Sequence, residues 1–263
     1  MASIDFDALG DYHKKLEGLS ETRLIPGVPV IARLDGRAFH TLTRNAVKPY
    51  DENFITCMET TCIALVKEFN ASIGYVQSDE ISLVWSSLDT FDGRIQKLCS
   101  VMSGIASVVF NEALNQTYFK HSVSIPVFDC RIWQVPSLSV AAENLMWREM
   151  DASKNSISMA AHALFGSKRL ENVPTKQRLA LLEQHGYFWN ELDARLKRGS
   201  FFKKVIEWRE LTEEELEKIP AQHRPNHPVE RSAIKRMEWE RLTTMTNAMQ
   251  VLFLDSEPNY YEK

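Results

Sequence analysis

The sequence predicts an α+β protein whose core is a polymerase palm-like, ferredoxin-like βαββαβ sheet with a helical C-terminal extension. Two observations lead to this fold class. Short apolar, β-prone runs bounded by turn residues alternate with two stretches that carry apolar residues at helical spacing. In addition, two of these apolar runs lead into acidic turns. This topology makes the first and third strands antiparallel neighbours and so brings the two turns to one edge of the sheet.

The first half of the predicted core contains one strand and one helix. Before it, residues 8–19 predict a short amphipathic helix. Residues 28–34 form a buried-strand run that delivers Asp35 and Gly36 to a turn. Residues 52–69 carry apolar side chains at helical spacing and predict the first helix of the core.

The second half of the predicted core begins with a hairpin. Strand-like runs at residues 72–76 and 81–85 flank the acidic tip Gln77-Ser78-Asp79-Glu80. Residues 94–115 return to the helical period, and residues 123–128 predict a last strand that ends at Asp129. We therefore expect Asp35 and Asp79 to meet at the sheet edge, where a metal and its substrate could reach them.

Residues 141–263 are predicted to form a helical and basic extension packed on the palm-like core of residues 1–140. Residues 141–165 predict a long helix, after which basic side chains become frequent. Thr212 and Glu215 form a capping-box pattern that opens a short acidic helix. Since no internal repeat or low-complexity linker separates the two parts, we interpret the second as an appendage rather than an independent domain.

The composition is that of a globular protein, with 44% apolar residues in a chain of 263. The chain has no run of about 18 consecutive apolar residues and no signal-peptide pattern, so we expect a cytoplasmic protein without a membrane partner. The 4 cysteines lack metal-ligand spacing and predict free thiols. A formal net charge of −4 argues against a general polycation, but a local basic surface could still bind nucleic acid.

Several short motifs follow one another along the chain. They are L-D-G-R-A-F-H from Leu34, Y-V-Q-S-D-E-I-S from Tyr75, F-D-C-R from Phe128, Trp147 and Arg148 with Asp151 and Asn155, and then Lys176, Asn190 and Lys197-Arg198-Gly199-Ser200. Over roughly residues 5–205 this order resembles the tRNA-His guanylyltransferase superfamily, which adds nucleotides in the 3'-to-5' direction at the 5' end of tRNA.

One departure from this resemblance affects the expected substrate. Eukaryotic guanylyltransferases carry H-I-N-N in the long helix, and its histidine is associated with recognition of the tRNA-His anticodon. This chain has Ser153-Lys154-Asn155-Ser156 instead. It therefore looks most like a bacterial-type Thg1-like protein, which implies templated repair of 5'-truncated tRNA. Addition of G at position −1 of tRNA-His is the alternative, and a palm-type nucleotide cyclase or a non-catalytic RNA-binding module is more remote.

The resemblance assigns catalysis to Asp35, Asp79 and Glu80. Asp35, the carbonyl of Gly36 and Asp79 would hold two Mg²⁺ ions, and Glu80 would assist nearby or orient the turn. Phosphoryl transfer needs little more than metals that gather phosphate oxygens and an aligned nucleophile. Judged from the residues alone, the same carboxylates could instead cap or solvate a hairpin.

The resemblance also predicts a nucleotide site around the first acidic turn, for ATP or GTP as activating nucleotide and for the nucleoside triphosphate that is added. The residues expected there are Gly36, Arg37, Ala38, Phe39, His40, Lys48, Ser78, Arg94 and Lys97. Other roles are open for some of them. Arg37 could form a salt bridge and Phe39 could belong to the core, whereas Arg94 and Lys97 could lie on a solvated helix surface.

A tRNA-binding surface is the last feature that the resemblance implies. Its expected residues are Arg148, Asp151, Asn155, Lys176, Asn190 and Arg198. The alternatives are an internal ion pair between Arg148 and Asp151 and, for the later residues, a solvated charged face. Members of the superfamily assemble as tetramers, so we expect a homotetramer.

Overall fold

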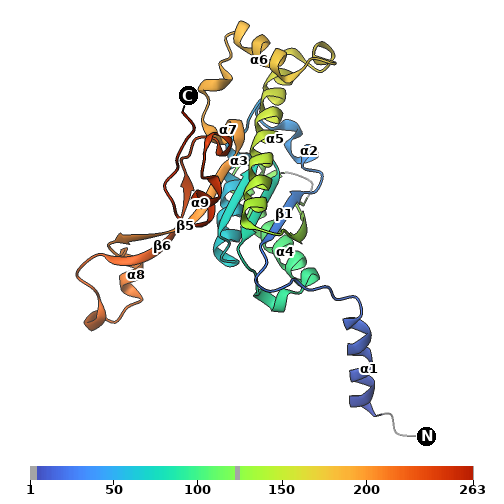
Figure 1. The fold of residues 1–263 in the computed structure, drawn as a ribbon, viewed down its shortest axis with the longest axis vertical. Helices are drawn as coiled ribbons and strands as arrows, with labels where there is room; N and C mark the ends of the chain where they lie inside the picture. Colours follow the sequence, from blue (N-terminus) through green and yellow to red (C-terminus); the bar gives the residue numbers. More distant parts are fainter. Residues whose placement is uncertain (1–4, 122–124, 263) are drawn as a thin grey trace.

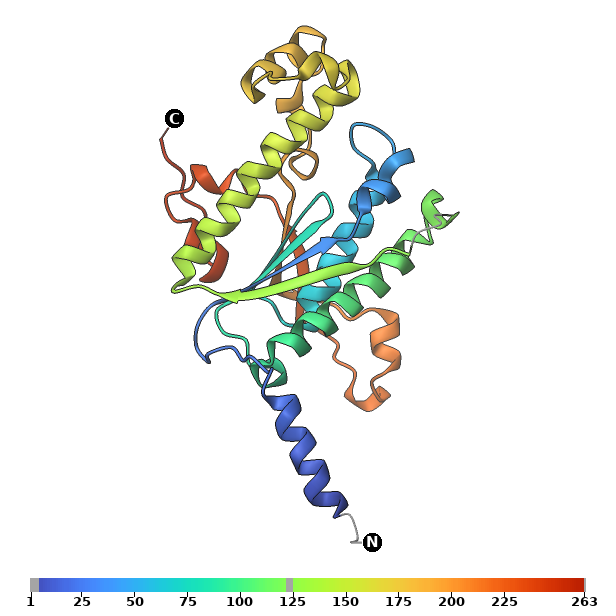
Figure 2. The same ribbon diagram turned by 90° about the vertical axis from the view of Figure 1, so that its right-hand side faces the viewer.

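The computed structural model describes residues 5–121 and 125–262, which form a layered α+β fold (Figure 1 and Figure 2). One sheet of six strands occupies the middle. Helices α3 (Glu52–Glu68) and α4 (Ile95–Leu114) cover one face, and the long helix α5 (Leu138–Phe165) covers the other. The predicted fold class is confirmed.

The sheet has the strand order β4-β1-β3-β2-β5-β6, and every pair of neighbours is antiparallel. The first four strands and the two helices between them follow the predicted βαββαβ order, with β1 beside β3 at the centre of this part. The strand bounds are β1 Val30–Gly36, β2 Ile73–Gln77, β3 Glu80–Trp85, β4 Phe128–Gln134, β5 Ser200–Arg209 and β6 Val229–Met237.

The last strand of the core was placed too early by the sequence pattern. Strand β4 begins at Phe128, where the predicted strand ends, and residues 122–124 lie outside the described part of the chain. Pro126 has no N–H to donate to a ladder, so regular pairing with β1 starts only after it. Asp129 consequently lies at the beginning of β4, opposite Asp35 in the register.

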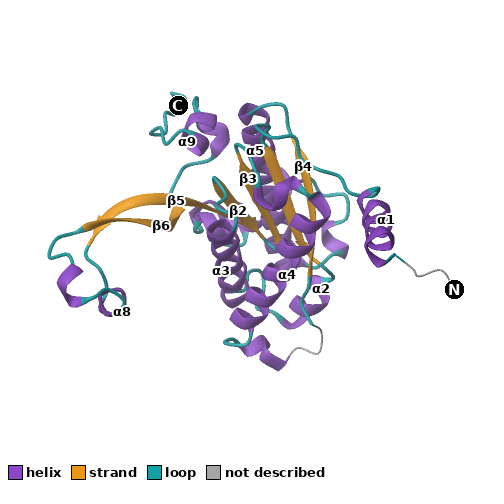
Figure 3. Cartoon of the chain, turned by 90° about the horizontal axis from the view of Figure 1, so that it is seen from below, coloured by secondary structure: helices purple, strands orange, loops and turns teal. Residues whose placement is uncertain are grey.

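The extension was predicted to be helical, but it also contains two strands. Strand β5 pairs with β2 and strand β6 pairs with β5, so the extension adds two strands to the palm sheet. The first residues of β5 are buried, whereas the outer half of the β5–β6 hairpin projects from the body of the protein (Figure 3). The sheet therefore crosses the boundary that was predicted near residue 140.

The remaining helices are short or peripheral. Helix α1 (Phe6–Gly18) stands away from the body and buries none of its residues (Figure 1). The capping box at Thr212 and Glu215 is present and opens α8. The other helices are α2 Phe39–Leu42, α6 Thr175–Gln184, α7 Ala194–Arg198, α8 Glu213–Glu217 and α9 Ala248–Phe253.

Alternation along β1 decides which side chains face α5. Val30, Ala32 and Leu34 point into the core beneath α3 and α4, whereas Ile31 belongs to the core beneath α5. Since successive side chains of a strand point to opposite faces, Arg33 and Asp35 share the face of Ile31. The first acidic motif is thereby directed toward α5.

Helix α4 is the one described helix whose length and mean hydropathy of 1.2 would allow it to cross a membrane. It instead packs along α3 and β4 and buries a stripe that includes Leu98, Met102 and Phe110. This pattern is that of a core helix. All 4 cysteines are free thiols, as predicted.

Candidate active site

The two acidic motifs meet at one edge of the sheet. Asp35 lies opposite Glu80 of β3 on one side and opposite Asp129 of β4 on the other. The amide of Gly36 donates a hydrogen bond to the carbonyl oxygen of Asp79, 2.9 Å away. The predicted juxtaposition of Asp35 and Asp79 is therefore confirmed. Asp129 is an additional carboxylate at this edge, which was not expected because the last strand was predicted to end, rather than begin, near it.

A tight turn presents Asp79. Ser78 and Asp79 alone connect β2 to β3, and Ser78 adopts a positive φ of 52°. Gly199, which follows α7, lies directly against the strand leading to this turn. A Cβ atom at Gly199 would be 2.4 Å from the carbonyl oxygen of Val76 and 2.9 Å from Cε2 of Tyr75. The turn is thus supported by backbone that leaves no room for a side chain.

The electrostatics of the turn favour a cation. Burial raises the pKa of Asp79, and the neighbouring Asp35 carboxylate raises it further, while the Ser78 hydroxyl and His40 act in the opposite direction. A bound Mg²⁺ would remove this repulsion, and two carboxylates with the Gly36 carbonyl are the hard oxygen donors that it prefers. The described residues contain no cluster of three or more ligating side chains, so water and phosphate oxygens would complete the coordination.

Glu80 is engaged in an internal ion pair. Its two carboxylate oxygens accept hydrogen bonds from Nε and Nη2 of Arg148, each 2.7 Å long, and Nε of Arg33 lies 3.5 Å from Oε2. Burial raises the pKa of Glu80, and the Arg148 and Arg33 guanidinium groups oppose that shift. In the structure Glu80 fastens α5 to the hairpin, while its catalytic role stays a prediction.

Two adjoining cavities open beside the turn. The larger one, about 680 Å³, is lined by Asp35, Asp79 and Glu80 and by one face of α5 that includes Asn155 and His162. The smaller one, about 300 Å³, extends between α2, the loop after it and α7. Lys48, Ser78 and Asp79 line both cavities, so the two form one continuous space with Asp79 where they meet and Asp35 in the larger one.

Of the nine residues predicted to bind the nucleotide, Phe39, His40, Lys48 and Ser78 line this space. His40 lines the smaller cavity, as does Phe39, although Phe39 is only 2% exposed and packs against Phe54, Phe110 and Phe128. Arg37 is exposed. The amides of Gly36 and Arg37 already donate to the carbonyls of Asp79 and Val127. Of the five amides from Gly36 to His40, those of residues 38–40 therefore remain for a phosphate in the described part of the chain.

Arg94 and Lys97 lie at the opposite end of the sheet. Nε of Arg94 is 3.5 Å from Glu21, and Nζ of Lys97 is 4.8 Å from the centroid of the Phe91 ring. Their neighbours adjoin the start of β1, whereas Asp35 is near its end, a separation of about 20 Å for a strand of this length. One chain does not bring these two cations to its own carboxylates.

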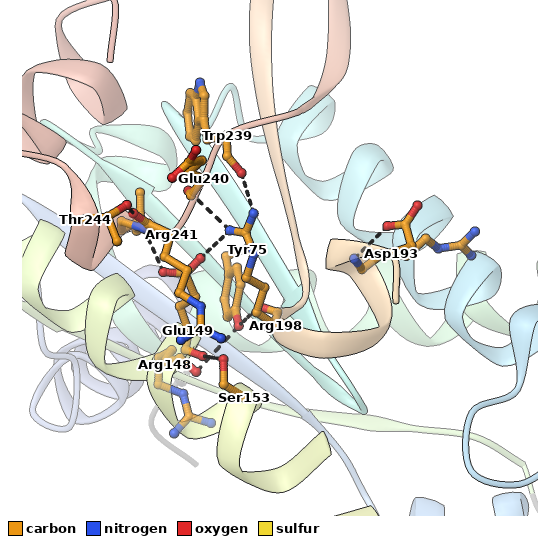
Figure 4. Close-up of polar contacts among 12 residues, drawn as sticks. Tyr75, Arg148, Glu149, Ser153, Asp193, Arg198, Trp239, Glu240, Arg241 and Thr244 are labelled. Atoms are coloured by element: carbon orange, nitrogen blue, oxygen red, sulfur yellow. Dashed lines mark hydrogen bonds and ion pairs between the residues drawn. The ribbon is translucent and has the colours of Figure 1, made fainter. Parts of the chain in front are cut away.

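The side chains of Arg148 and Arg198 are largely buried, and Arg198 lies among Glu149, Trp239 and Glu240 (Figure 4). Nη1 of Arg198 donates to Oε1 of Glu149 over 2.6 Å, and its guanidinium also donates to the carbonyls of Trp239 and Glu240. The hydroxyl of Tyr75 donates to the carbonyl of Arg198 over 2.7 Å. Both arginine side chains are 12% exposed, so the structure gives them internal roles, and their contact with tRNA stays a prediction.

The other residues predicted to contact tRNA are more accessible. Asn155 donates to Asp151 over 3.1 Å, and Asp151 lies 3.5 Å from Nη1 of Arg148, which was the alternative considered from sequence. Lys176 is exposed on α6, and Asn190 is exposed beside α7. The contacts by which Glu149 and Tyr75 join α5 to its surroundings could not be read from the sequence, because their partners are distant in the chain.

Comparisons with known proteins show the family of the chain. The family model described as tRNAHis guanylyltransferase (Thg1) matches residues 10–136. A bacterial Thg1-like protein in complex with ATP is 33% identical with a TM-score of 0.69, covering 74% of this chain and 88% of that one. A bacterial Thg1-like protein in complex with GTP is 29% identical with a TM-score of 0.70, covering 90% and 94%.

A eukaryotic relative extends the comparison. The tRNA(His) guanylyltransferase of Schizosaccharomyces pombe is 31% identical over 155 residues, which make up 56% of this chain and 57% of that protein. The matched family region spans both acidic motifs and the strands that hold them. The chain therefore belongs to the Thg1 family of nucleotidyltransferases that act on tRNA.

Proposed function

We propose that this family member repairs the 5' end of tRNA by templated 3'-to-5' nucleotide addition. The proposal rests on the paired carboxylates Asp35 and Asp79, which line a space large enough for a nucleotide and a polynucleotide end. Solved relatives in complex with ATP and with GTP support nucleotide binding by this chain.

The reaction would proceed in two displacements. First, the 5'-monophosphate of the RNA attacks the α-phosphorus of ATP or GTP, which releases pyrophosphate and leaves a nucleotide linked to the 5' end through a new P–O–P bond. The 3'-hydroxyl of an incoming nucleoside triphosphate then loses its proton and attacks the 5' phosphorus, and AMP or GMP leaves. Mg²⁺, when bound, would supply charge neutralisation for both displacements.

The residues of the chain would position these groups. Asp35, the Gly36 carbonyl and Asp79 would hold two Mg²⁺ ions. The apolar part of the smaller cavity, around Phe54, suits a base, and Lys48, at the junction of the two cavities, suits its phosphates. Phosphate binding by the free amides of residues 38–40 would complete the nucleotide site.

Repair is favoured over addition of G to tRNA-His by the residue at position 153. Where eukaryotic guanylyltransferases have histidine, Ser153 is buried, and its hydroxyl donates to the carbonyl of Glu149 over 3.0 Å. This side chain offers no imidazole for anticodon recognition. We accordingly propose selection by the base opposite the incoming nucleotide rather than by the anticodon.

Arg94 and Lys97 suggest the assembly. Because they lie at the far end of the sheet from Asp35, they could reach a triphosphate only at the site of a neighbouring copy. Such a contribution fits the homotetramer expected from the superfamily. We also propose a cytoplasmic location, which fits a tRNA substrate. Loss of activity in Lys97→Gln that is restored by mixing with Asp79→Asn would support sites shared between copies.

The direct test uses a tRNA transcript that lacks its 5' nucleotide, incubated with Mg²⁺, ATP and each nucleoside triphosphate. Addition of only the nucleotide complementary to the opposing base is expected. Asp79→Asn should abolish addition, while the matched change of the exposed Asp89 to Asn should not. Addition of G alone, and to tRNA-His alone, would instead establish the guanylyltransferase activity.

A further inference from the structure

Another cavity, separate from the two at the active site, lies on the side of α5 that faces away from the carboxylates. Its volume is about 320 Å³, and α5 contributes Glu149, Met150, Ser153, Lys154 and Ile157 to it. The residues of α5 that face the larger cavity, such as Arg148 and Asn155, lie on the opposite side of the helix. The floor is apolar, formed in part by Leu179 and Trp189.

Cations gather around the indole of Trp189. Cζ of Arg241 and Nζ of Lys197 each lie 5.8 Å from the centroid of the Trp189 ring. Arg241 and Lys154 line this cavity, whereas Lys197 lines the smaller cavity of the active site. The indole is held in place because its Nε1 donates to the hydroxyl of Ser156 over 3.1 Å. Burial lowers the pKa of Lys197, and the positive charges of Arg198 and Arg241 lower it further.

In the described chain no carboxylate forms an ion pair with Lys154, Lys197 or Arg241, although Asp193 and Glu149 lie near enough to offset part of this positive charge. Glu149 is the one carboxylate lining the cavity, but its oxygens accept from Arg198 over 2.6 Å and from the amide of Leu242 over 2.8 Å (Figure 4). Nζ of Lys197 donates to the carbonyl of Asn190 over 2.7 Å. The side chains of Lys154 and Arg241 form no hydrogen bond or ion pair with any residue of the ranges 5–121 and 125–262.

We propose that Lys154 and Arg241 form a binding site for a backbone phosphate of the RNA substrate, with Lys197 adding positive charge nearby, an inference that rests on the proposed function. Repelling cations beside an apolar floor are stabilised by an anion. A free nucleoside triphosphate would arrive with Mg²⁺, for which the occupied Glu149 offers no ligand. RNA whose 5' end lies at Asp79 needs to cross only one helix, about 10 Å wide, to reach this cavity.

The experiment compares tRNA binding by the wild-type chain and by Lys154→Gln/Arg241→Gln, at several salt concentrations. The double variant should bind about tenfold more weakly, since charge-assisted hydrogen bonds are lost, and its salt slope should fall by about 1 or more. A matched control, Lys67→Gln/Lys218→Gln, removes two exposed charges elsewhere and should leave both quantities unchanged. Arg241→Lys, which keeps the charge, should retain most of the binding.

The outcomes separate this site from the active site. Unchanged tRNA affinity and salt slope in the double variant, with a wild-type chain that binds and extends tRNA, would overturn the phosphate site alone. Loss of ATP or GTP binding in place of tRNA binding would reassign the cavity to a free nucleotide. A wild-type chain that neither binds nor extends tRNA would overturn the proposed function and the phosphate site together.

Discussion

Replacing Gly199 by alanine tests how closely the chain packs behind the catalytic turn. Gly199 has φ 82° and ψ −176°, a conformation that is nearly restricted to glycine. Gly166 has a similar backbone, with φ 74° and ψ 162°, but a Cβ atom there would have no heavy atom within 4 Å. Gly166→Ala therefore carries the backbone strain alone, and Gly199→Ala adds the collision with Val76 and Tyr75.

The difference between these two variants can be estimated. Both should lose about 1–3 kcal/mol from backbone strain. Gly199→Ala should lose roughly 1–3 kcal/mol more, because a backbone carbonyl at 2.4 Å has to move. The corresponding further fall in Tm is roughly 2–12 °C at about 2–4 °C per kcal/mol.

Thermal and urea unfolding of the two variants and of the wild type would measure these losses. The turn should move with the carbonyl of Val76, so nucleotide addition should also fall in Gly199→Ala and not in Gly166→Ala. Equal losses of stability in the two variants would refute the close packing behind the turn.

Three further predictions concern ion pairs and metal binding. Arg148→Met should lower the free energy of unfolding by up to about 3–5 kcal/mol because it leaves buried Glu80 with only the more distant guanidinium of Arg33. Glu80→Gln in the same chain should restore most of this loss, and denaturant titration measures both. The pKa of Glu215 is lowered to about 2, chiefly by Arg209, so the stability that this pair gives α8 is complete above the ordinary value near 4.5 and is lost as the pH falls through 2. Amide hydrogen exchange of α8 should follow this pH range, and Glu215→Gln should abolish the dependence. Mg²⁺ with ATP should raise the Tm of the wild type, an increase that EDTA removes and that Asp79→Asn lacks.

The part of the fold built from local patterns was predictable. Strand β1, the hairpin of β2 and β3, and helices α3 and α4 all carry clear periodicity, and their order determines that Asp35 lies beside Asp79. Strand β5 was missed because Lys203 and Lys204 interrupt its apolar run. Lys203 is nevertheless buried, since its Nζ donates to the carbonyl of Val251 over 3.0 Å and pairs with Asp255.

The functions of charged side chains depended on partners that the sequence does not reveal. Arg148 and Arg198 have the composition of an RNA-binding surface, but each meets a buried glutamate, Glu80 or Glu149. Conversely, Arg241 lies far along the chain from Lys154 and approaches it only through folding. The sign of a side chain's charge can therefore be read from the sequence, whereas the partner that neutralises it is known only from the tertiary structure.

The adjacent positions of Arg148 and Glu149 have a consequence for how the protein tolerates change. Through these two residues a single turn of α5 is tied both to the catalytic hairpin and to the segment around Leu242. Loss of the C-terminal segment would remove the amide and carbonyl partners of Glu149 and Arg198 and release α5 on that side. Changes near the end of the chain can thus alter the alignment of Asp79 without touching nucleotide or tRNA, which makes the C-terminus a remote determinant of catalytic geometry.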